Sequence, residues 1–267
     1  MSAERPLVPA VTRAVAILEL LGSAREPLGI SAIARHLGLP KSSVANICGA
    51  LVETGLLRLN GPGFSLGQRL AQLGAAYLAG VDQVQSFHEA CARLDAARDE
   101  TIQLALLADG LDVIYLARRE GVFPVRLAST FGRALPATCA ATGKAILADL
   151  DEAEVTARLA TVEQLPALTP QSITDSEALG HELAEIRRVG YALDREEVIE
   201  GVVCVAAAVP GPGPSGQRLA VSITLLKPRA TPELLSTLAG ELRAMAARLA
   251  PDLGHIAPLG HTSRVAP

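Results

Sequence analysis

Tryptophan is absent from this chain of 267 residues, and aromatic residues make up only 3% of it. Proteins that hold single-stranded nucleic acid stack its bases on aromatic side chains, so the composition argues against a surface of that kind. Cysteine is also scarce: Cys48, Cys91, Cys139 and Cys204 stand far apart and form no CxxC pair. This spacing excludes a disulfide framework and a zinc finger, and it is typical of ordinary buried thiols.

Long apolar runs are lacking too. No stretch of about 18 apolar residues is available to span a membrane, and the N-terminal segment MSAERPLVPA lacks the apolar core of a signal peptide. We therefore expect a soluble, cytoplasmic protein without a membrane partner. The sequence contains no GxSxG, HExxH or phosphate-loop motif either, so we expect no enzyme activity, no metal and no cofactor.

Hydrophobic residues, by contrast, make up 49% of the chain, which is ample for buried cores, and the length is comfortable for two domains. The charge is distributed unevenly, because residues 1–80 carry a net charge of +3 and residues 81–267 carry −7. A basic N-terminal part on an acidic body suggests that only this part meets a polyanion. Since the positive charge is modest, chance is the alternative explanation.

Residues 1–67 have the pattern of a winged helix-turn-helix. Apolar residues at spacings of three and four predict a helix over residues 10–21. Ser31 is the expected N-cap of a second short helix, and a third helix is expected over residues 41–53. Two short apolar strands then flank the turn sequence NGPG at residues 60–63. Three helices followed by a hairpin form a DNA-binding domain.

A second pattern follows the hairpin. Residues 68–98 have a helical pattern, which we interpret as a linker helix over residues 68–82 and the first helix of a second domain, residues 83–250. From Glu100 onward, clustered antiparallel strands flanked by helices predict an α+β fold rather than an alternating parallel sheet. Two strands around the turn sequence ADGLD are expected within residues 101–118, and further strands at residues 122–129, 202–210 and 218–226. The helices are expected at residues 140–149, 151–160, 176–189 and 231–249. The tail, residues 251–267, is expected to be disordered.

The third helix opens with polar and small side chains. A recognition helix places its N-terminal residues nearest the bases of the major groove, and the residues outside the apolar stripe here are Lys41, Ser42, Ser43, Ala45 and Asn46. Asparagine can pair with an adenine edge, serine can bond a phosphate or a base, and lysine can offset phosphate charge. We therefore expect these residues to contact DNA. The alternatives are that the serines only cap the helix, that Asn46 is merely solvated, and that the winged helix binds a protein.

Five segments resemble the IclR family of bacterial transcriptional regulators, in the same order along the chain. They are TRAVAILELL (12–21), LPKSSVANIC (39–48), FSLGQRLAQLG (64–74), LPATCAATGKAILADL (135–150) and GYALDREEVIEGVVCVAAAV (190–209). The chain departs from the family at two places, because Asn46 replaces a frequent arginine of the recognition helix and Thr138 replaces the usual histidine before GKA. For this reason, neither the operator sequence nor the histidine contact of the family can be transferred to this chain.

The resemblance implies a transcription factor with an N-terminal winged helix and a C-terminal effector domain. The effector domain is expected to be GAF/profilin-like, with helices flanking a curved antiparallel sheet. The resemblance also implies three kinds of partner: double-stranded operator DNA, a small organic acid or aromatic catabolite as effector, and further copies of the chain in a homodimer or homotetramer.

The effector site is expected around the start of the helix at residues 140–149. The small residues there leave backbone N–H groups accessible, and a helix start attracts a carboxylate. The alternative is a tight packing contact, which small residues also serve. The residues expected at the site are Leu127, Thr130, Ala141, Thr142, Gly143, Asp194, Cys204, Ser222 and Thr224.

The resemblance supplies Asp194 as a ligand contact and Cys204 as a pocket residue, whereas a surface acid and a buried thiol are the alternatives. Ser222 and Thr224 lie two apart on one strand, so they face the same side, either toward the ligand or toward solvent. An ionised aspartate only accepts hydrogen bonds. We therefore expect Asp194 to select an acid that also carries a hydroxyl or hydrated carbonyl.

Two other functions remain open. The first is a thiol redox switch that uses Cys139 and Cys204, although reactivity requires exposure and a lowered thiol pKa. The second is a small-molecule enzyme built on the second domain, for which the sequence offers no pair of nucleophile and base.

Overall fold

The structure is a computed structural model that describes residues 8–80, 82–122, 134–213 and 216–250. It separates into two units, residues 1–81 and residues 82–267. The predicted tail and nearly all of the strand expected at residues 122–129 lie outside the described residues, as do the predicted site residues Leu127 and Thr130. None of the helices in the described part of the chain is both long and apolar enough to cross a membrane.

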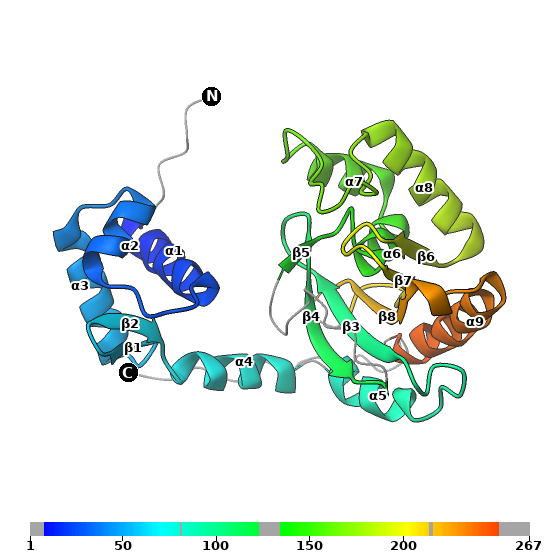
Figure 1. The fold of residues 1–267 in the computed structure, drawn as a ribbon, viewed down its shortest axis with the longest axis horizontal. Coiled ribbons are helices and arrows are strands. Elements are labelled where there is room, and N and C mark those ends of the chain that lie inside the picture. The colour runs from blue at the N-terminus through cyan, green and yellow to red at the C-terminus, as the bar shows by residue number, and fades with distance from the viewer. Residues whose placement is uncertain (1–7, 81, 123–133, 214–215, 251–267) are drawn as a thin grey trace, which may run out of the picture. The chain divides into compact units, whose positions relative to one another are not determined.

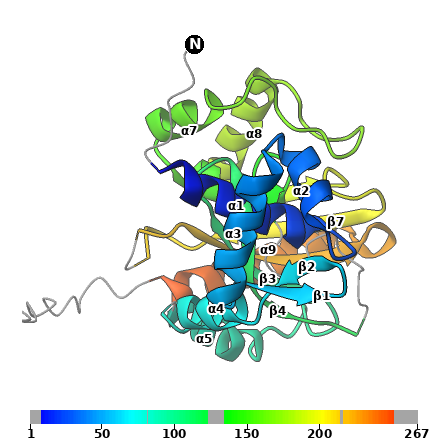
Figure 2. The same ribbon diagram turned by 90° about the vertical axis from the view of Figure 1, so that its left-hand side faces the viewer.

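The described residues of the first unit form a winged helix-turn-helix, drawn in blue and cyan in Figures 1 and 2. Its elements are α1 (Pro9–Ser23), α2 (Ile30–Leu37), α3 (Lys41–Glu53), β1 (Leu57–Asn60), β2 (Gly63–Leu66) and α4 (Arg69–Ala79). Apolar side chains at helical spacing meet in one core, which includes Ile17 of α1, Ile33 of α2 and Val44 of α3. Gly38 ends α2 in the left-handed conformation with φ of 63° and turns the chain toward α3.

The prediction that Ser31 caps α2 is wrong. The cap is Gly29, and Ser31 lies inside the helix. Leu28 forms a backbone bridge with Phe64 of the hairpin, with N···O distances of 3.2 and 2.9 Å. This tertiary bridge keeps the chain extended up to Gly29, so the helix starts directly afterwards.

The hairpin turns tightly at Gly61 and Pro62. Asn60 pairs with Gly63 across the antiparallel ladder, and Gly61 has φ of 59°, a conformation that favours glycine. Gly63 has a packing role, because an added Cβ would lie 2.9 Å from the carbonyl carbon of Pro27.

The helical pattern of residues 68–98 corresponds to two helices, and the second of them is shorter than the pattern. Helix α4 ends before Gly80. Helix α5 (Asp82–Cys91) ends at Cys91, seven residues before the end of the helical pattern at residue 98. The Arg119 guanidinium donates hydrogen bonds to the backbone carbonyls of Cys91 and Ala97 at 3.3 and 2.6 Å. The segment after α5 therefore satisfies carbonyl groups without continuing the helix.

The second unit is built on one antiparallel sheet. In the described residues its strand order is β5-β4-β3-β8-β7-β6. The strands are β3 (Thr101–Leu107), β4 (Asp112–Arg119), β5 (Ala134–Pro136), β6 (Ala192–Arg195), β7 (Val202–Ala208) and β8 (Leu219–Leu226). Every pairing within it is antiparallel, which confirms the predicted α+β class.

Helices cover both faces of this sheet (Figure 1). Helix α6 (Ala141–Asp149) packs on one face and is covered by α8 (Ser176–Val189), with α7 (Glu152–Leu159) nearby. Helices α5 and α9 (Pro232–Leu249) pack on the other face, and a short 3₁₀ turn at Lys227–Arg229 leads into α9. This arrangement makes α6 an inner helix.

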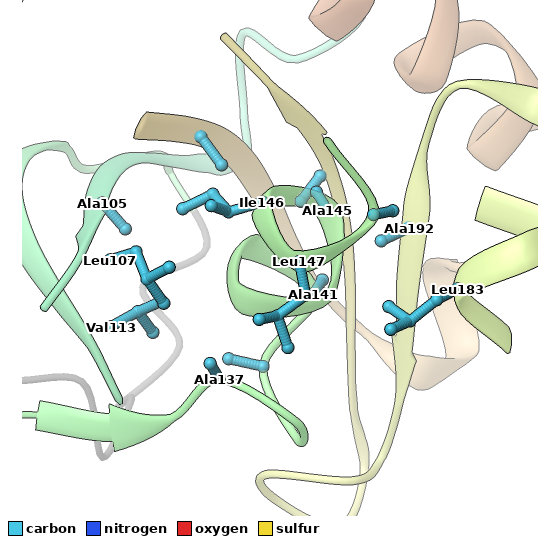
Figure 3. Packing of buried hydrophobic residues seen from close by; sticks show 14 of the residues in the cluster. Ala105, Leu107, Val113, Ala137, Ala141, Ala145, Ile146, Leu147, Leu183 and Ala192 are labelled. Carbon is cyan, nitrogen blue, oxygen red and sulfur yellow. The ribbon is translucent and has the colours of Figure 1, made fainter. Parts of the chain in front are cut away.

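The burial of α6 explains why its sequence is so small and apolar. All eight residues from position 141 to position 148 are buried. Figure 3 shows Ile146 and Leu147 of this helix packed among side chains from the strands, such as Leu107 and Val113, and from α8. A helix that is enclosed on all sides cannot show the one-sided periodicity of a surface helix.

Candidate functional sites

The first candidate site is the outer side of helix α3. Lys41, Ser42 and Asn46 are exposed, and Ser43 and Ala45 are partly exposed. The opposite side holds Val44, Cys48 and Leu51 in the core. The five residues predicted to contact DNA thus lie outside the buried stripe of α3, on the side that faces away from the core of this unit.

The start of α3 has no capping side chain. Pro40 occupies the N-cap position and no side chain bonds the helix start, so Ser42 and Ser43 do not cap the helix. The first backbone N–H groups of a helix lack partners within it and favour an anion such as a phosphate. The serine hydroxyls are therefore left for contacts outside the helix.

The hairpin offers a further basic group that the sequence reasoning did not single out. Arg58 on β1 is exposed, and its neighbour Leu59 is 65% exposed. In β1 only Leu57 is buried, and the residues from Arg58 to Asn60 are exposed.

The second candidate site is a pocket between the sheet and the start of α6. Its lining residues are Gln103, Tyr115, Leu135, Ala141, Thr142, Asp194, Val198, Ile199, Val202, Cys204, Ser222 and Thr224. The strand register explains this gathering. Asp194, Cys204 and Thr224 lie side by side across β6, β7 and β8, and Ser222 on β8 pairs with Gln103 on β3.

Polar side chains in the pocket contact one another. Tyr115 Oη lies 3.3 Å from Thr142 Oγ1, which joins strand β4 to the start of α6. Thr224 Oγ1 lies 3.4 Å from Cys204 Sγ and donates to Gln103 Oε1 at 3.5 Å. Thr142, Ser222 and Thr224 are buried rather than solvent-facing. The pocket is therefore a polar patch within a largely apolar layer.

Gly143 does not line the pocket. A Cβ at this position would fall on the backbone of Ala137, against both its carbonyl oxygen and its Cα. The small residue here serves a close approach of α6 to the segment before it, which is the alternative that the sequence left open. Ala141 and Thr142 do line the pocket at the start of the helix.

Asp194 is almost completely buried, with 2% of its surface exposed. Its Oδ1 accepts hydrogen bonds from the backbone N–H groups of Glu197 and Val198 at 2.6 and 3.3 Å. Burial raises the pKa of Asp194 to about 7, although the N–H group of Glu197 and the charge of Lys144 favour its ionised form. The protonated form of Asp194 is therefore accessible near neutral pH, and in that form the carboxyl can donate a hydrogen bond as well as accept one.

A buried ion cluster lies behind Asp194. The Lys144 ammonium contacts Glu197 Oε1 at 2.5 Å and Glu182 Oε1 at 3.3 Å. Burial raises the pKa of Glu197, and Lys144 opposes this rise. The cluster joins α6, α8 and the turn after β6, so it fixes both sides of the pocket relative to each other.

The thiols do not have the character of a redox switch. Burial raises the pKa of Cys139, whose Sγ donates to the carbonyl of Pro166 at 3.2 Å. Desolvation by the surrounding protein atoms and the charge of the nearby Asp194 raise the pKa of the Cys204 thiol. A reactive cysteine needs the opposite shift, and nothing in this geometry supports the redox alternative.

The pocket residues missed by the sequence reasoning are mainly Gln103 and Tyr115. Each is a buried polar side chain with an apolar residue on either side of it along the strand. A polar residue inside such a strand was the available signal, because a buried polar group needs a partner. Their placement opposite Ser222 and Thr142 depends on register, which a single sequence does not give.

An exposed helix after a tight turn, a hairpin beside it and a separate α+β unit are the features of a DNA-binding regulator with a second domain. The profile described as "IclR helix-turn-helix domain" matches residues 10–61, and the one described as "Bacterial transcriptional regulator IclR C-terminal" matches residues 75–250. The chain belongs to the IclR family of transcriptional regulators. It is a DNA-binding regulator rather than an enzyme.

Known relatives agree with this assignment. The HTH-type transcriptional regulator XynR of Escherichia coli K12 is 34% identical over 206 residues, covering 76% of this chain and 81% of XynR. The crystal structure of an IclR transcriptional regulator from Alicyclobacillus acidocaldarius is 27% identical with a TM-score of 0.79, covering 92% of this chain and 98% of that chain. An IclR homologue from Microbacterium hydrocarbonoxydans, complexed with 4-hydroxybenzoate, is 24% identical with a TM-score of 0.74. It covers 91% of this chain and 98% of that one, and its likeness concerns the fold.

Proposed function

We propose that this regulator binds double-stranded operator DNA through α3 and that a small organic acid in the pocket of the second unit controls that binding. The observation that carries the second half is the pocket itself. Thr142, Asp194, Ser222 and Thr224 come from three separate parts of the chain, are buried, and line one cavity beside a helix start. Groups of this kind are what fix the orientation of a small ligand.

On the DNA side, the side chains of α3 have distinct roles. Asn46 reads a base edge, since its amide offers both a donor and an acceptor. Lys41, Ser42 and Ser43 hold phosphates together with the free N–H groups at the helix start. Arg58 on the hairpin adds a further phosphate contact. One such unit makes few contacts, so we expect a homodimer or homotetramer that reads two half-sites.

On the effector side, the ligand carboxylate lies at the start of α6, against the N–H groups near Ala141 and the hydroxyl of Thr142. A second polar group of the ligand, such as a hydroxyl or hydrated carbonyl, bonds Ser222 and Thr224. Asp194 completes the set from β6. A helix start stabilises negative charge, and two hydroxyls can serve either as donors or as acceptors.

The pocket must widen to take such a ligand. Its cavity volume is about 20 Å³, which is room for one or two water molecules. Side chains such as Val198 and Ile199, which belong to the turn after β6, form part of the lining. Displacement of this turn by an acid would move the attached ion cluster of Lys144, Glu197 and Glu182, and so would change the packing of α6 against α8.

The test uses the full-length chain and three acids that carry a carboxylate with a hydroxyl or hydrated carbonyl, namely glyoxylate, lactate and 4-hydroxybenzoate. Calorimetry measures binding to the wild type, to Asp194→Ala and to the control Asp149→Asn. Asp149 is an exposed acid that pairs with Arg218, and it does not line the pocket. We expect Asp194→Ala to weaken binding by about 1.5–3 kcal/mol, the cost of a lost hydrogen bond to a charged group. If the three acids leave the wild type unbound, or if Asp194→Ala binds them as the wild type does, the site is assigned wrongly.

A further inference from the structure

Lys144 is a lysine with no exposed surface. An ammonium group that lies beside a pocket for an acid could serve as its counter-ion. The structure shows a different arrangement, because two carboxylates already hold it. Glu197 lies at 2.5 Å and Glu182 at 3.3 Å from Nζ, and Lys144 is not among the residues that line the pocket.

The pocket therefore offers an arriving anion no positive side chain among its described lining residues. It does offer Asp194, which is 2% exposed and lines the same cavity. Two negative carboxylates in one buried space repel each other strongly. The helix start and the pocket hydroxyls can stabilise one negative charge, and the two backbone N–H groups that bond Asp194 Oδ1 do not offset the cost of burying a second.

We propose that an acidic effector binds as its anion together with one proton, which Asp194 takes up from water, because the Lys144 ammonium is already held by Glu197 and Glu182. This inference rests on the proposed function of the pocket. The protonated Asp194 then donates its proton in a hydrogen bond to the ligand, while its Oδ1 still accepts from the backbone N–H groups of Glu197 and Val198.

The other titratable groups around Asp194 are not better proton carriers. Cys204 lies opposite on β7, and its pKa is raised by burial and then by Asp194 itself. Burial also raises the pKa of Tyr115 on β4 and of Cys139 before α6. These three groups stay neutral at neutral pH. Glu197 remains paired with Lys144, so Asp194 is the group whose charge can change.

The expected pH dependence follows by linkage. In the free protein the pKa of Asp194 is about 7, so the carboxyl is already protonated below this pH and must be protonated on binding above it. The dissociation constant for an anionic effector is then nearly constant below about pH 7 and rises with pH above it. Between about pH 6 and about pH 8 the expected rise is about tenfold.

The test is calorimetry of the full-length chain with glyoxylate and with 4-hydroxybenzoate, whose carboxyl groups stay ionised over this range. Titrations at about pH 7.5 in buffers of different ionisation enthalpy count the protons exchanged. We expect the wild type to take up about three-quarters of a proton per ligand, since a carboxyl with a pKa of about 7 is then about one-quarter protonated. Asp194→Asn should take up none, and its affinity should not depend on pH.

Two further variants complete the design. Asp149→Asn, a matched carboxyl with a raised pKa outside the pocket, should keep the uptake and pH profile of the wild type. Glu197→Gln removes a negative charge that raises the pKa of Asp194, so the pH at which affinity begins to fall should move downward. It also provides a readout if Asp194→Asn does not fold.

Wild-type binding without proton uptake, or equal uptake by Asp194→Asn, would overturn the inference while leaving the proposed function intact. Failure of every acid to bind the wild type would instead overturn the proposed function, and with it this inference.

Discussion

Asp194 is a single carboxyl group whose chemistry is set by its surroundings rather than by its type. Two backbone N–H groups favour its ionised form, whereas burial and the charge of Glu197 favour the protonated form. Its ordinary pKa of 3.8 rises to about 7. The group is therefore poised near neutral pH, where a small change in the pocket alters its charge.

The raised pKa of Asp194 predicts a pH-dependent stability of the second unit. The folded state prefers the protonated carboxyl, so its contribution is fully present below about pH 4 and is lost as pH rises to about 7. Asp194→Asn does not titrate. Relative to this variant, the free energy of unfolding of the wild type should fall by about 3–4 kcal/mol between these limits. Urea unfolding of both proteins at several pH values measures the difference, and parallel profiles would contradict the burial of an ionisable Asp194.

At the DNA site, Asn46 and Lys41 should behave differently on substitution. Asn46→Ala removes an amide able to read a base edge, so discrimination between the operator and its single-base variants should fall by about 1–3 kcal/mol. Lys41→Ala removes a phosphate contact and should weaken all sequences alike. Fluorescence anisotropy on a set of operator variants measures both. Unchanged affinity ratios for Asn46→Ala would show that Asn46 is not a reader.

At the scale of elements, helix α6 shows how one segment serves both fold and site. Its first residues line the pocket, its Lys144 holds the ion cluster, and its Gly143 allows contact with the backbone of Ala137. Because these functions share nine residues, a change in packing at one of them is expected to disturb the others.

Gly143→Ala and Gly240→Ala form a matched pair of helical glycine substitutions. A methyl group at Gly143 meets the Ala137 backbone, whereas one at Gly240 of α9 meets no atom within 4 Å. We expect Gly143→Ala to lower the free energy of unfolding by about 1–3 kcal/mol through overpacking. Gly240→Ala should raise it by about 0.5–1 kcal/mol, since alanine has the higher helix propensity. Thermal unfolding of the wild type and both variants measures these changes. Equal changes in the two variants would contradict the close contact between α6 and the Ala137 backbone.

The elements that the sequence predicted well are those with local signals. Helices such as α8 and α9 show clear apolar periodicity with caps, and NGPG marks a tight turn. The start of α2 was misplaced because the bridge between Leu28 and Phe64 is a tertiary contact. The role of Gly143 was open for the same reason. The register of the strands places Gln103 and Tyr115 in the pocket, and this register depends on residues far apart in the chain.

At the scale of the whole molecule, the chain forms two units with separate cores. Ile17, Ile33 and Val44 belong to the core of the first unit, whereas the cluster around α6 belongs to the second. The family resemblance gave the right order of these units, because its motifs are spread along the chain.

The fragment of residues 1–80 should bind operator DNA weakly, and the full chain should bind it tightly. One winged helix makes too few phosphate contacts for strong specific binding, and dimers read two half-sites. Affinity of the full chain should fall steeply with salt as counterions are released. Circular dichroism confirms that the fragment is folded before anisotropy titrations compare the two. Equal affinities, or affinity independent of salt, would contradict this account.

The central claim is that occupation of the pocket controls DNA binding, and one titration tests it directly. Labelled DNA from the regions beside the gene is titrated with the full-length wild type and with Asp194→Ala, in the absence and presence of an acid shown by calorimetry to bind the wild type. We predict that both proteins bind the same DNA equally without acid, and that the acid shifts the affinity of the wild type but not that of the variant. An acid that occupies the pocket and leaves the DNA affinity of the wild type unchanged would contradict the account.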